Sequence, residues 1–195
     1  MLLPDLLNAL ADLTAQEPRP EAQATAKALR AAATTDFPAR PASALSAEIL
    51  RTAALPGHPA ARLIHAAHPW LPWQDSPIAA LQPTDLRAIK SVVTLLGPGA
   101  PIRSDTLLFG LFYQAPDAYY PLHAHNAAET YTILSGSAHW QAGDRHVPTT
   151  IAEPIHHPPT LPHAMRAGPD GFLAMWRWSG DIAFDSNRML PDPKA

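Results

Sequence analysis

Four side chains that can bind metal ions gather in one short stretch of this sequence, YYPLHAHNAAETYTILSG. They are His123, His125, Glu129 and Tyr131, and they fall within nine positions. Imidazole, carboxylate and phenolate groups are all ligands of divalent metals in proteins. The stretch therefore predicts a divalent metal site.

A second histidine-rich stretch, EPIHHPPTLPHAMRA, offers a ligand from a distant part of the chain. His163 follows a proline-rich turn and opens an apolar segment, a position that holds a side chain rigidly at the end of a sheet. His156 and His157 are adjacent, so on a strand they point in opposite directions and at most one of them joins a site. Because the chain has no cysteine, any metal must be held by histidine, carboxylate, tyrosine or water.

Strand geometry explains how these groups could come together. Side chains two positions apart share one face of a strand, so His123 and His125 project the same way, and Glu129 and Tyr131 do likewise. The intervening residues, NAA, let the chain bend between the two pairs. If both segments line one interior, three or four of these groups converge, and a further ligand comes from a distant strand.

The elements that must position these residues change in type along the chain. Residues 1–70 are rich in alanine and leucine at helical spacing, which predicts several short helices, one of them over Pro59–Ala67. From residue 68 onward, prolines, tryptophans and then β-branched residues replace that pattern, and no helical crossovers separate the short strands. This pattern favours an antiparallel sandwich or barrel. We therefore expect a helical N-terminal subdomain over residues 1–75 and a β-barrel domain over residues 76–195.

Glycine, proline and aspartate turns bound the predicted strands. The strands are Ile89–Leu95, Thr106–Gln114, Tyr119–His125, Glu129–Ser135, Ser137–Ala142, His146–Ile151, Ile155–His157, His163–Ala167 and Phe172–Ser179. In the helical part, Ser43 is the expected cap of the helix that follows TTDFPARPAS.

Composition excludes several classes of function. The 195 residues carry a formal charge of −3 without a run of lysine or arginine, so neither a nucleic acid nor a membrane surface is an expected partner. No apolar run approaches the roughly 20 residues of a membrane span. The N-terminal MLLPDLLNALADLTAQ lacks the basic start of a secretory signal. We expect a cytoplasmic globular protein.

Residues 117–136 resemble the first motif of the cupin family, in which Gly, HxH, Glu and Gly follow one another at set intervals. Four residues stand at those intervals: His123, His125, Glu129 and Gly136. Asp117 replaces the leading glycine of the motif. The general cupin pattern makes His123 a metal ligand.

The second cupin motif is matched less completely. Pro158 and His163 fit it, whereas its glycine positions hold Ala152 and Thr160 and its terminal asparagine is Ala167. The resemblance implies a mainly β protein, a compact jelly-roll-like cupin barrel preceded by a layer of short α-helices, with one divalent metal. It says little about the reaction, because one fold supports many chemistries.

A closer resemblance covers most of the chain. The run YYPLHAHNAAETYTILSGSAHWQAGD, the helical N-terminal third and the later MWRWSGDI are similar to the dimethylsulfoniopropionate (DMSP) lyases of the DddQ type. The metal ligands that this resemblance implies are His125, Glu129, Tyr131 and His163. It places Tyr120 and His123 at other active-site positions, where both are expected to contact the substrate. His123 and Tyr131 therefore compete for one ligand position.

The implied reaction is a β-elimination. A base removes the proton next to the substrate carboxylate, and dimethyl sulfide leaves the next carbon as acrylate forms. A tyrosine with its ordinary pKa of about 10 is too protonated near neutral pH, but a nearby cation favours tyrosinate. Tyr120 is the expected base and Tyr131 the alternative, because a ligand bound throughout turnover makes a poorer base. Zinc is the expected metal, and iron, manganese or nickel also suits these ligands.

The sulfonium group of DMSP cannot donate a hydrogen bond, so aromatic faces are expected to hold it. The available rings are Trp140, Trp176, Trp178, Phe109, Tyr113 and Tyr119. Of these, Trp178 is the one that we expect to contact the substrate. Two other functions stay open: another metallocupin enzyme, such as a dioxygenase or isomerase acting on a small carboxylate, and a non-catalytic cupin that binds a small molecule. The helices either cap one end of the barrel or mediate a homodimer.

Overall fold

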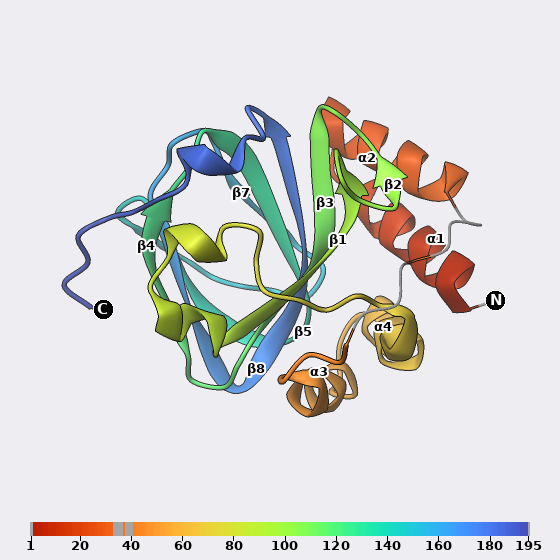
Figure 1. The fold of residues 1–195 in the computed structure, drawn as a ribbon, viewed down its shortest axis with the longest axis horizontal. Coiled ribbons are helices and arrows are strands. Elements are labelled where there is room, and N and C mark those ends of the chain that lie inside the picture. Colours follow the sequence, from red (N-terminus) through yellow and green to blue (C-terminus); the bar gives the residue numbers. More distant parts are fainter. Residues whose placement is uncertain (1, 33–36, 38–40, 195) are drawn as a thin grey trace.

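Four α-helices open the chain in the computed structural model, which describes residues 2–32, 37 and 41–194 (Figure 1). They are α1 (Leu2–Thr14), α2 (Pro20–Ala31), α3 (Ser46–Ala53) and α4 (Pro59–Ala67). The predicted helix at Pro59–Ala67 is confirmed. α2 and α4 each begin with proline, whose missing N–H is not needed in the first helical turn.

The predicted cap of α3 is wrong. The N-cap position of α3 is Leu45, and no side chain caps it. Ser43 lies two residues earlier, where its hydroxyl accepts the N–H of Leu45 at 3.2 Å and closes a turn ahead of the helix. Most of the preceding TTDFPARPAS segment lies outside the described residues.

Nine strands of the described chain form one sheet, which rolls into a barrel (Figure 1). The strands are β1 (Lys90–Gly97), β2 (Ile102–Arg103), β3 (Leu107–Gln114), β4 (Tyr119–Ala124), β5 (Ala127–Ala142), β6 (Arg145–Val147), β7 (Pro154–His157), β8 (His163–Gly180) and β9 (Arg188–Met189). The main path runs β2-β1-β3-β8-β4-β9, and β5 adds pairings to β6, β7 and β8. All pairings except β1 with β2 are antiparallel. The predicted jelly-roll-like barrel behind N-terminal helices is confirmed.

The two longest strands, β5 and β8, each join two of the predicted strands. They pair with each other from Ala127↔Gly180 to Ala142↔His163. The predicted turn at residues 168–171 bulges out of the ladder between its two halves instead of ending the strand. The chain continues as a strand there because pairing resumes on both sides of the bulge.

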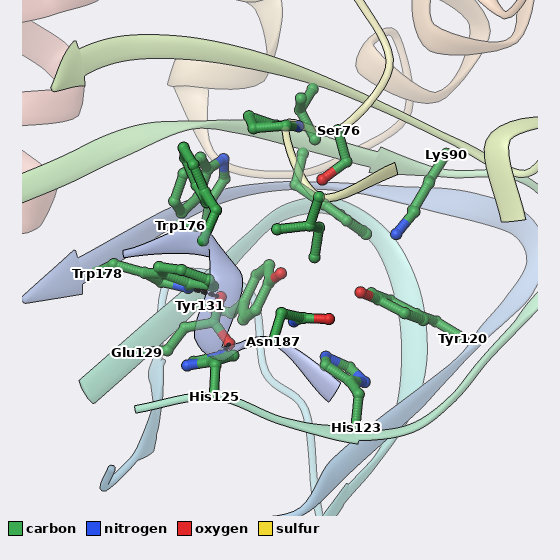
Figure 2. Close-up of a pocket in the computed structure, with 15 residues that line it drawn as sticks. Ser76, Lys90, Tyr120, His123, His125, Glu129, Tyr131, Trp176, Trp178 and Asn187 are labelled. Atoms are coloured by element: carbon green, nitrogen blue, oxygen red, sulfur yellow. Dashed lines mark hydrogen bonds and ion pairs between the residues drawn. The ribbon is translucent and has the colours of Figure 1, made fainter. Parts of the chain in front are cut away.

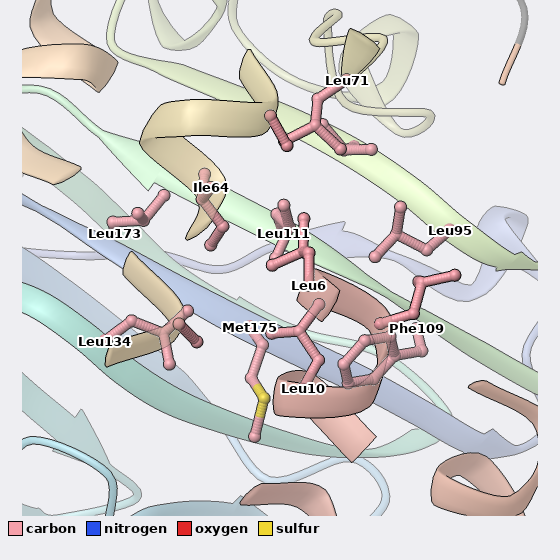
Figure 3. Packing of buried hydrophobic residues seen from close by; sticks show 14 of the residues in the cluster. Leu6, Leu10, Ile64, Leu71, Leu95, Phe109, Leu111, Leu134, Leu173 and Met175 are labelled. Atoms are coloured by element: carbon pink, nitrogen blue, oxygen red, sulfur yellow. The ribbon is translucent and has the colours of Figure 1, made fainter. Parts of the chain in front are cut away.

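Alternate side chains of the strands face two different apolar clusters. The inner cluster fills the barrel and contains Val92, Phe112, Ile133, Phe172, Ala174 and Trp176, among others. The outer cluster contains the intervening residues Val93, Phe109, Leu111, Leu134, Leu173 and Met175. Helix residues such as Leu6, Leu10 and Ile64 pack on the outer cluster (Figure 3). The helices therefore cover an outer face of the barrel and share one core with it, and the boundary near residue 75 stays a prediction.

Three non-glycine residues have backbone conformations that favour glycine. The φ angles of Asp117, Ala152 and Thr160 are 56°, 69° and 66°. They occupy the three glycine positions of the cupin motifs that this sequence replaces. The barrel therefore keeps the left-handed turns of those motifs and accepts some backbone strain, which is greatest for the β-branched Thr160.

Within the described residues, no helix combines the length and the apolar character that crossing a membrane requires.

Candidate metal centre and active site

Three buried side chains present ligand atoms to one another inside the barrel. His125 directly follows β4, Glu129 lies on β5, and His163 opens β8. One ligand atom from each lies within 4.8 Å of the other two. Glu129 Oε2 is 3.1 Å from His125 Nε2 and 3.0 Å from His163 Nε2. His125 and Glu129 are seen side by side at the cavity wall in Figure 2.

The rolled sheet brings this group together from opposite ends of one ladder. Along the β5–β8 pairing, Glu129 is opposite Trp178, whereas His163 is opposite Ala142 at the other end. On its other edge, β5 pairs with β7, where His157 lies opposite Glu129. His163 therefore meets Glu129 through curvature of the barrel and not through strand pairing.

Backbone carbonyls orient both imidazole rings. The Nδ1 of His125 lies 3.0 Å from the carbonyl oxygen of Ala127, and the Nδ1 of His163 lies 2.9 Å from that of Leu161. A carbonyl only accepts hydrogen bonds, so each Nδ1 carries a proton and each Nε2 turns a lone pair toward Glu129. The buried Nε2 of His163 has no hydrogen-bond partner among the described residues. Two lone pairs and a carboxylate oxygen that face one another in a buried space fit a divalent cation.

The remaining oxygen of Glu129 is held by Trp178, whose indole Nε1 donates to Oε1 at 2.6 Å. Trp178 also packs on the ring of His125, with 4.1 Å between the ring centroids. Burial by itself would raise the pKa of Glu129, but positive charge on the rings of His125 and His163 when they are protonated, with the hydrogen bonds that they then donate, outweighs burial and holds that pKa well below 4.5. Glu129 is therefore an ionised carboxylate in a fixed orientation.

His157 supports the group from behind. Its ring stacks on that of His163, with centroids 4.2 Å apart and an angle of 10° between the planes. Its Nε2 accepts the indole N–H of Trp140 at 2.9 Å, which leaves its proton on Nδ1, 3.7 Å from Glu129 Oε2. Burial holds the pKa of His157 well below 6.5, and protonation of the neighbouring His163 lowers that pKa further. Of the two adjacent histidines, His157 thus lies against the ligand group, whereas His156 is half-exposed.

Tyr120, His123 and Tyr131 line the same cavity (Figure 2). Tyr120 lies flat on His123, with ring centroids 4.0 Å apart and 11° between the planes. The Nδ1 of His123 donates to the carbonyl of Pro121 at 2.8 Å, and its ring is edge-on to His163. The ligand group that converges among the described residues is formed without His123. The ligand role of Tyr131 and the catalytic roles of Tyr120 and His123 stay predictions.

Aromatic rings form much of the cavity wall. Trp176 and Trp178 line it, edge to face with centroids 6.1 Å apart, and Phe112 and Phe184 join them. The other candidate rings do not line this cavity. Trp140 donates a hydrogen bond to His157, Tyr119 donates one to Asp192, and Phe109 and Tyr113 belong to the outer cluster. The wall thus suits an organic cation, which aromatic faces attract.

Sequence reasoning missed a lysine and a glutamine beside Tyr120. Lys90 is 3% exposed, its Nζ lies 3.8 Å from the centroid of the Tyr120 ring, and it donates to Gln82 Oε1 at 2.5 Å. The amide nitrogen of Gln82 in turn donates to the Tyr120 hydroxyl oxygen. Burial lowers the pKa of Lys90 from 10.5 to about 7. A lone charge within the apolar strand KSVVTLLG was the available signal for Lys90, because lysine is almost never fully buried without a reason.

Asn187, which lies between β8 and β9 and directly precedes β9, also lines the cavity. It is 7% exposed and projects among Tyr120, His123 and Tyr131 (Figure 2). Nothing in its local sequence, DSNRM, distinguishes it from a solvated turn. Its place at the cavity is visible only in the tertiary structure.

Comparison with known proteins gives matches in both sequence and structure. A family model described as dimethylsulfoniopropionate lyase matches residues 16–174. The curated dimethylsulfoniopropionate lyase DddQ of Ruegeria pomeroyi is 38% identical over 90 residues, which are 45% of this chain and 44% of that relative. That alignment therefore spans less than half of the relative's length.

Two solved structures resemble the whole chain. One belongs to the crystal structures of the DMSP lyases RdDddP and RnDddQII, with a TM-score of 0.72, 27% identity, and coverage of 97% of this chain and 98% of that one. The other is the DMSP lyase DddQ from Ruegeria pomeroyi DSS-3, with a TM-score of 0.69, 25% identity, and coverage of 93% and 92%. Both likenesses include the helical layer as well as the barrel.

Proposed function

Because this chain belongs to the dimethylsulfoniopropionate lyase family, we propose that it cleaves DMSP into dimethyl sulfide and acrylate. The observation that carries the proposal is the buried group His125, Glu129 and His163, of which His125 and Glu129 line a cavity walled by tyrosine and tryptophan. DMSP is a zwitterion, and this cavity offers ligands for a metal cation at one place and aromatic faces at another. That division matches the two charged ends of the substrate.

The reaction balances as a simple elimination. The proton leaves the carbon next to the carboxylate, and the electron pair of that C–H bond forms the double bond of acrylate. The bond from the next carbon to sulfur breaks, and its electron pair leaves with dimethyl sulfide. A divalent ion held by His125, Glu129 and His163 would supply Lewis-acid stabilisation of the charge that develops at the substrate carboxylate.

Tyr120 is the proposed base. In the protein alone, burial and then the charge of Glu129 raise its pKa, so this phenol needs positive charge and hydrogen-bond donors to ionise. Gln82 supplies a donor to its oxygen, and Lys90 places an ammonium group over its ring. Both interactions favour the phenolate over the phenol. The phenolate takes the substrate proton and returns to the neutral form.

Tyr131 is the proposed fourth metal ligand and the alternative base. It lies on β5 two residues after Glu129, on the same side of the strand, and burial raises its pKa well above 10. A ligand that stays on the metal through turnover is the poorer base, which favours Tyr120. His123, stacked on Tyr120, is proposed to hold that ring and to contact the substrate.

The sulfonium end of the substrate is proposed to lie against the faces of Trp176 and Trp178. A permanent cation without hydrogen-bond donors gains most from such faces. Trp178 then has two tasks, since its N–H already orients Glu129.

The direct test is the release of dimethyl sulfide from DMSP, measured in the headspace above purified protein. The sample is compared with a chelator-stripped sample and with stripped protein reloaded with zinc. Gas that disappears with the metal and returns on reloading supports the proposal. A metal-loaded protein that releases none refutes it, and oxygen uptake with small carboxylates would then test for a dioxygenase.

The base is identified by comparing Tyr120→Phe with Tyr131→Phe. Loss of a positioned base lowers kcat by about 10²- to 10⁴-fold. Tyr120→Phe should show that loss with metal content unchanged, whereas Tyr131→Phe should lower metal content. Tyr113→Phe is the control, because Tyr113 is buried in the outer cluster and away from the cavity.

A further inference from the structure

Asn187 carries a buried amide group that no neighbour satisfies. Its side chain is 7% exposed, and neither its oxygen nor its nitrogen has a hydrogen-bond partner among the described residues. Leaving such a group unpaired in a protein interior is costly. The amide lies in the cavity that contains Tyr120, His123 and Tyr131 (Figure 2).

A backbone hydrogen bond and strand pairing hold the chain around Asn187 in place. The N–H of Asn187 donates to the carbonyl of Phe184 at 3.1 Å. The next two residues form β9, in which Arg188 pairs with Ala124 and Met189 with His123. β9 thus fixes Asn187 directly beside the strand that leads to the ligand group.

Both ends of this C-terminal segment, residues 181–192, are also tied to the barrel. At its start, the side chain of Asn126 donates to Asp181 at 3.0 Å. At its end, the carboxylate of Asp192 accepts the Tyr119 hydroxyl at 2.7 Å and the Leu122 N–H at 2.8 Å. The segment is therefore a fixed wall of the cavity.

We infer that Asn187 binds the carboxylate of the substrate through its side-chain N–H. This inference rests on the proposed function. DMSP has one hydrogen-bonding group, its carboxylate, which only accepts; the sulfonium neither donates nor accepts. The N–H of Asn187 therefore has one match on such a substrate. The side-chain oxygen of Asn187 carries partial negative charge, so a cationic group is favoured next to that oxygen.

The neighbouring donors make Asn187 the suitable contact. One N–H of the Lys90 ammonium donates to Gln82, and the indole N–H of Trp178 donates to Glu129. The indole N–H of Trp176 donates to the carbonyl of Leu111 at 3.3 Å. Asn187 keeps its donors free for a ligand.

The test is an NMR titration of the zinc-loaded, full-length protein with sodium acrylate, the carboxylate product, to obtain a dissociation constant. Asn187→Leu removes the donor at similar size, and Asn187→Asp keeps the shape but places a negative charge near the carboxylate. Since a hydrogen bond to a charged group accounts for roughly a 10- to 100-fold difference in affinity, Asn187→Leu should weaken acrylate binding by about that factor. Asn187→Asp should weaken it further. Asn8→Leu, the same change at an exposed position of α1, should leave it unchanged.

Neutral acrylamide separates the charge effect from the shape of the cavity. Asn187→Asp should disfavour acrylate strongly and acrylamide little, because only acrylate is repelled. In turnover assays with DMSP, Asn187→Leu should raise KM more than it lowers kcat, since a contact present in ground and transition states acts mainly on binding. Far-UV circular dichroism and zinc content show whether each variant keeps its fold and metal.

The outcomes separate this inference from the proposed function. If the parent binds acrylate and releases dimethyl sulfide but Asn187→Leu and Asn187→Asp bind acrylate equally well, the inference is refuted and the lyase function stands. If the parent neither binds acrylate nor releases dimethyl sulfide, the proposed function fails and the inference fails with it. If Asn187→Leu does not fold, the isosteric Asn187→Asp decides alone.

Discussion

Replacing Trp178 with phenylalanine should weaken metal binding without removing a ligand. The change deletes the indole N–H that donates to Glu129 Oε1 at 2.6 Å and leaves an aromatic ring beside His125. That bond fixes one carboxylate oxygen, so the other points at the Nε2 atoms of His125 and His163. Without it, the carboxylate must be ordered when the metal binds.

Two independent estimates give the size of this effect. A hydrogen bond to a charged, buried group contributes about 1.5–3 kcal/mol, and every 1.4 kcal/mol is a factor of about ten. Loss of an outer hydrogen bond to a metal ligand typically reduces metal affinity by about 10- to 100-fold. Both predict that Trp178→Phe raises the zinc dissociation constant by about one to two orders of magnitude.

The assay is competition for zinc between the protein and a chromophoric chelator. Trp176→Phe is the matched control, because Trp176 lies two residues away on the same face of β8 and its N–H donates only to the carbonyl of Leu111. It should retain the parental zinc affinity. Unchanged affinity in Trp178→Phe, or an equal loss in Trp176→Phe, would contradict the view that Trp178 orients Glu129.

Three further predictions concern stability. Thr160→Gly should raise the melting temperature. The left-handed backbone at Thr160 costs about 1–2 kcal/mol, which is more than the about 0.5–1 kcal/mol of additional chain entropy that glycine loses on folding. A lower melting temperature would contradict the conclusion that Thr160 is strained. Below pH 7, Lys90 is protonated in both the folded and the unfolded state. Between about pH 7 and pH 10.5, the folded protein has lost this proton while the unfolded chain still keeps it. The contribution of Lys90 to the unfolding free energy should therefore rise with pH in that window. Lys90→Met should therefore be stabilising below pH 7 and progressively less so above it in denaturant titrations, and a pH-independent difference would refute the lowered pKa. Arg177→Met should cost about 1.5–3 kcal/mol in the same assay, because Glu17 loses its two hydrogen bonds of 2.6 and 3.0 Å from Arg177 but keeps its ion pair with Arg19 at 2.8 Å, and adding Glu17→Gln should restore part of the loss.

The sequence by itself determined the type of site and the type of fold. The spacing of His125 and Glu129 and the alternation along the strands are local properties, because side chains on a strand alternate with a period of two residues. His163 was identifiable as a distant partner by its place at the start of an apolar segment. The helix over Pro59–Ala67 was likewise readable from composition and its initial proline.

Only the tertiary structure decided which groups meet. His163 and Glu129 lie at opposite ends of the β5–β8 ladder, so their contact depends on how the whole sheet curls. The place of His157 behind His163, and of Lys90 over Tyr120, depends in the same way on strands that pair far apart in sequence. Asn187 reaches the cavity because β9 pairs with β4, and a two-residue strand leaves no periodic pattern in a sequence. Features that depend on residue type and on the alternation of side chains along a strand can be predicted from the sequence. The convergence of distant side chains depends on how the barrel closes.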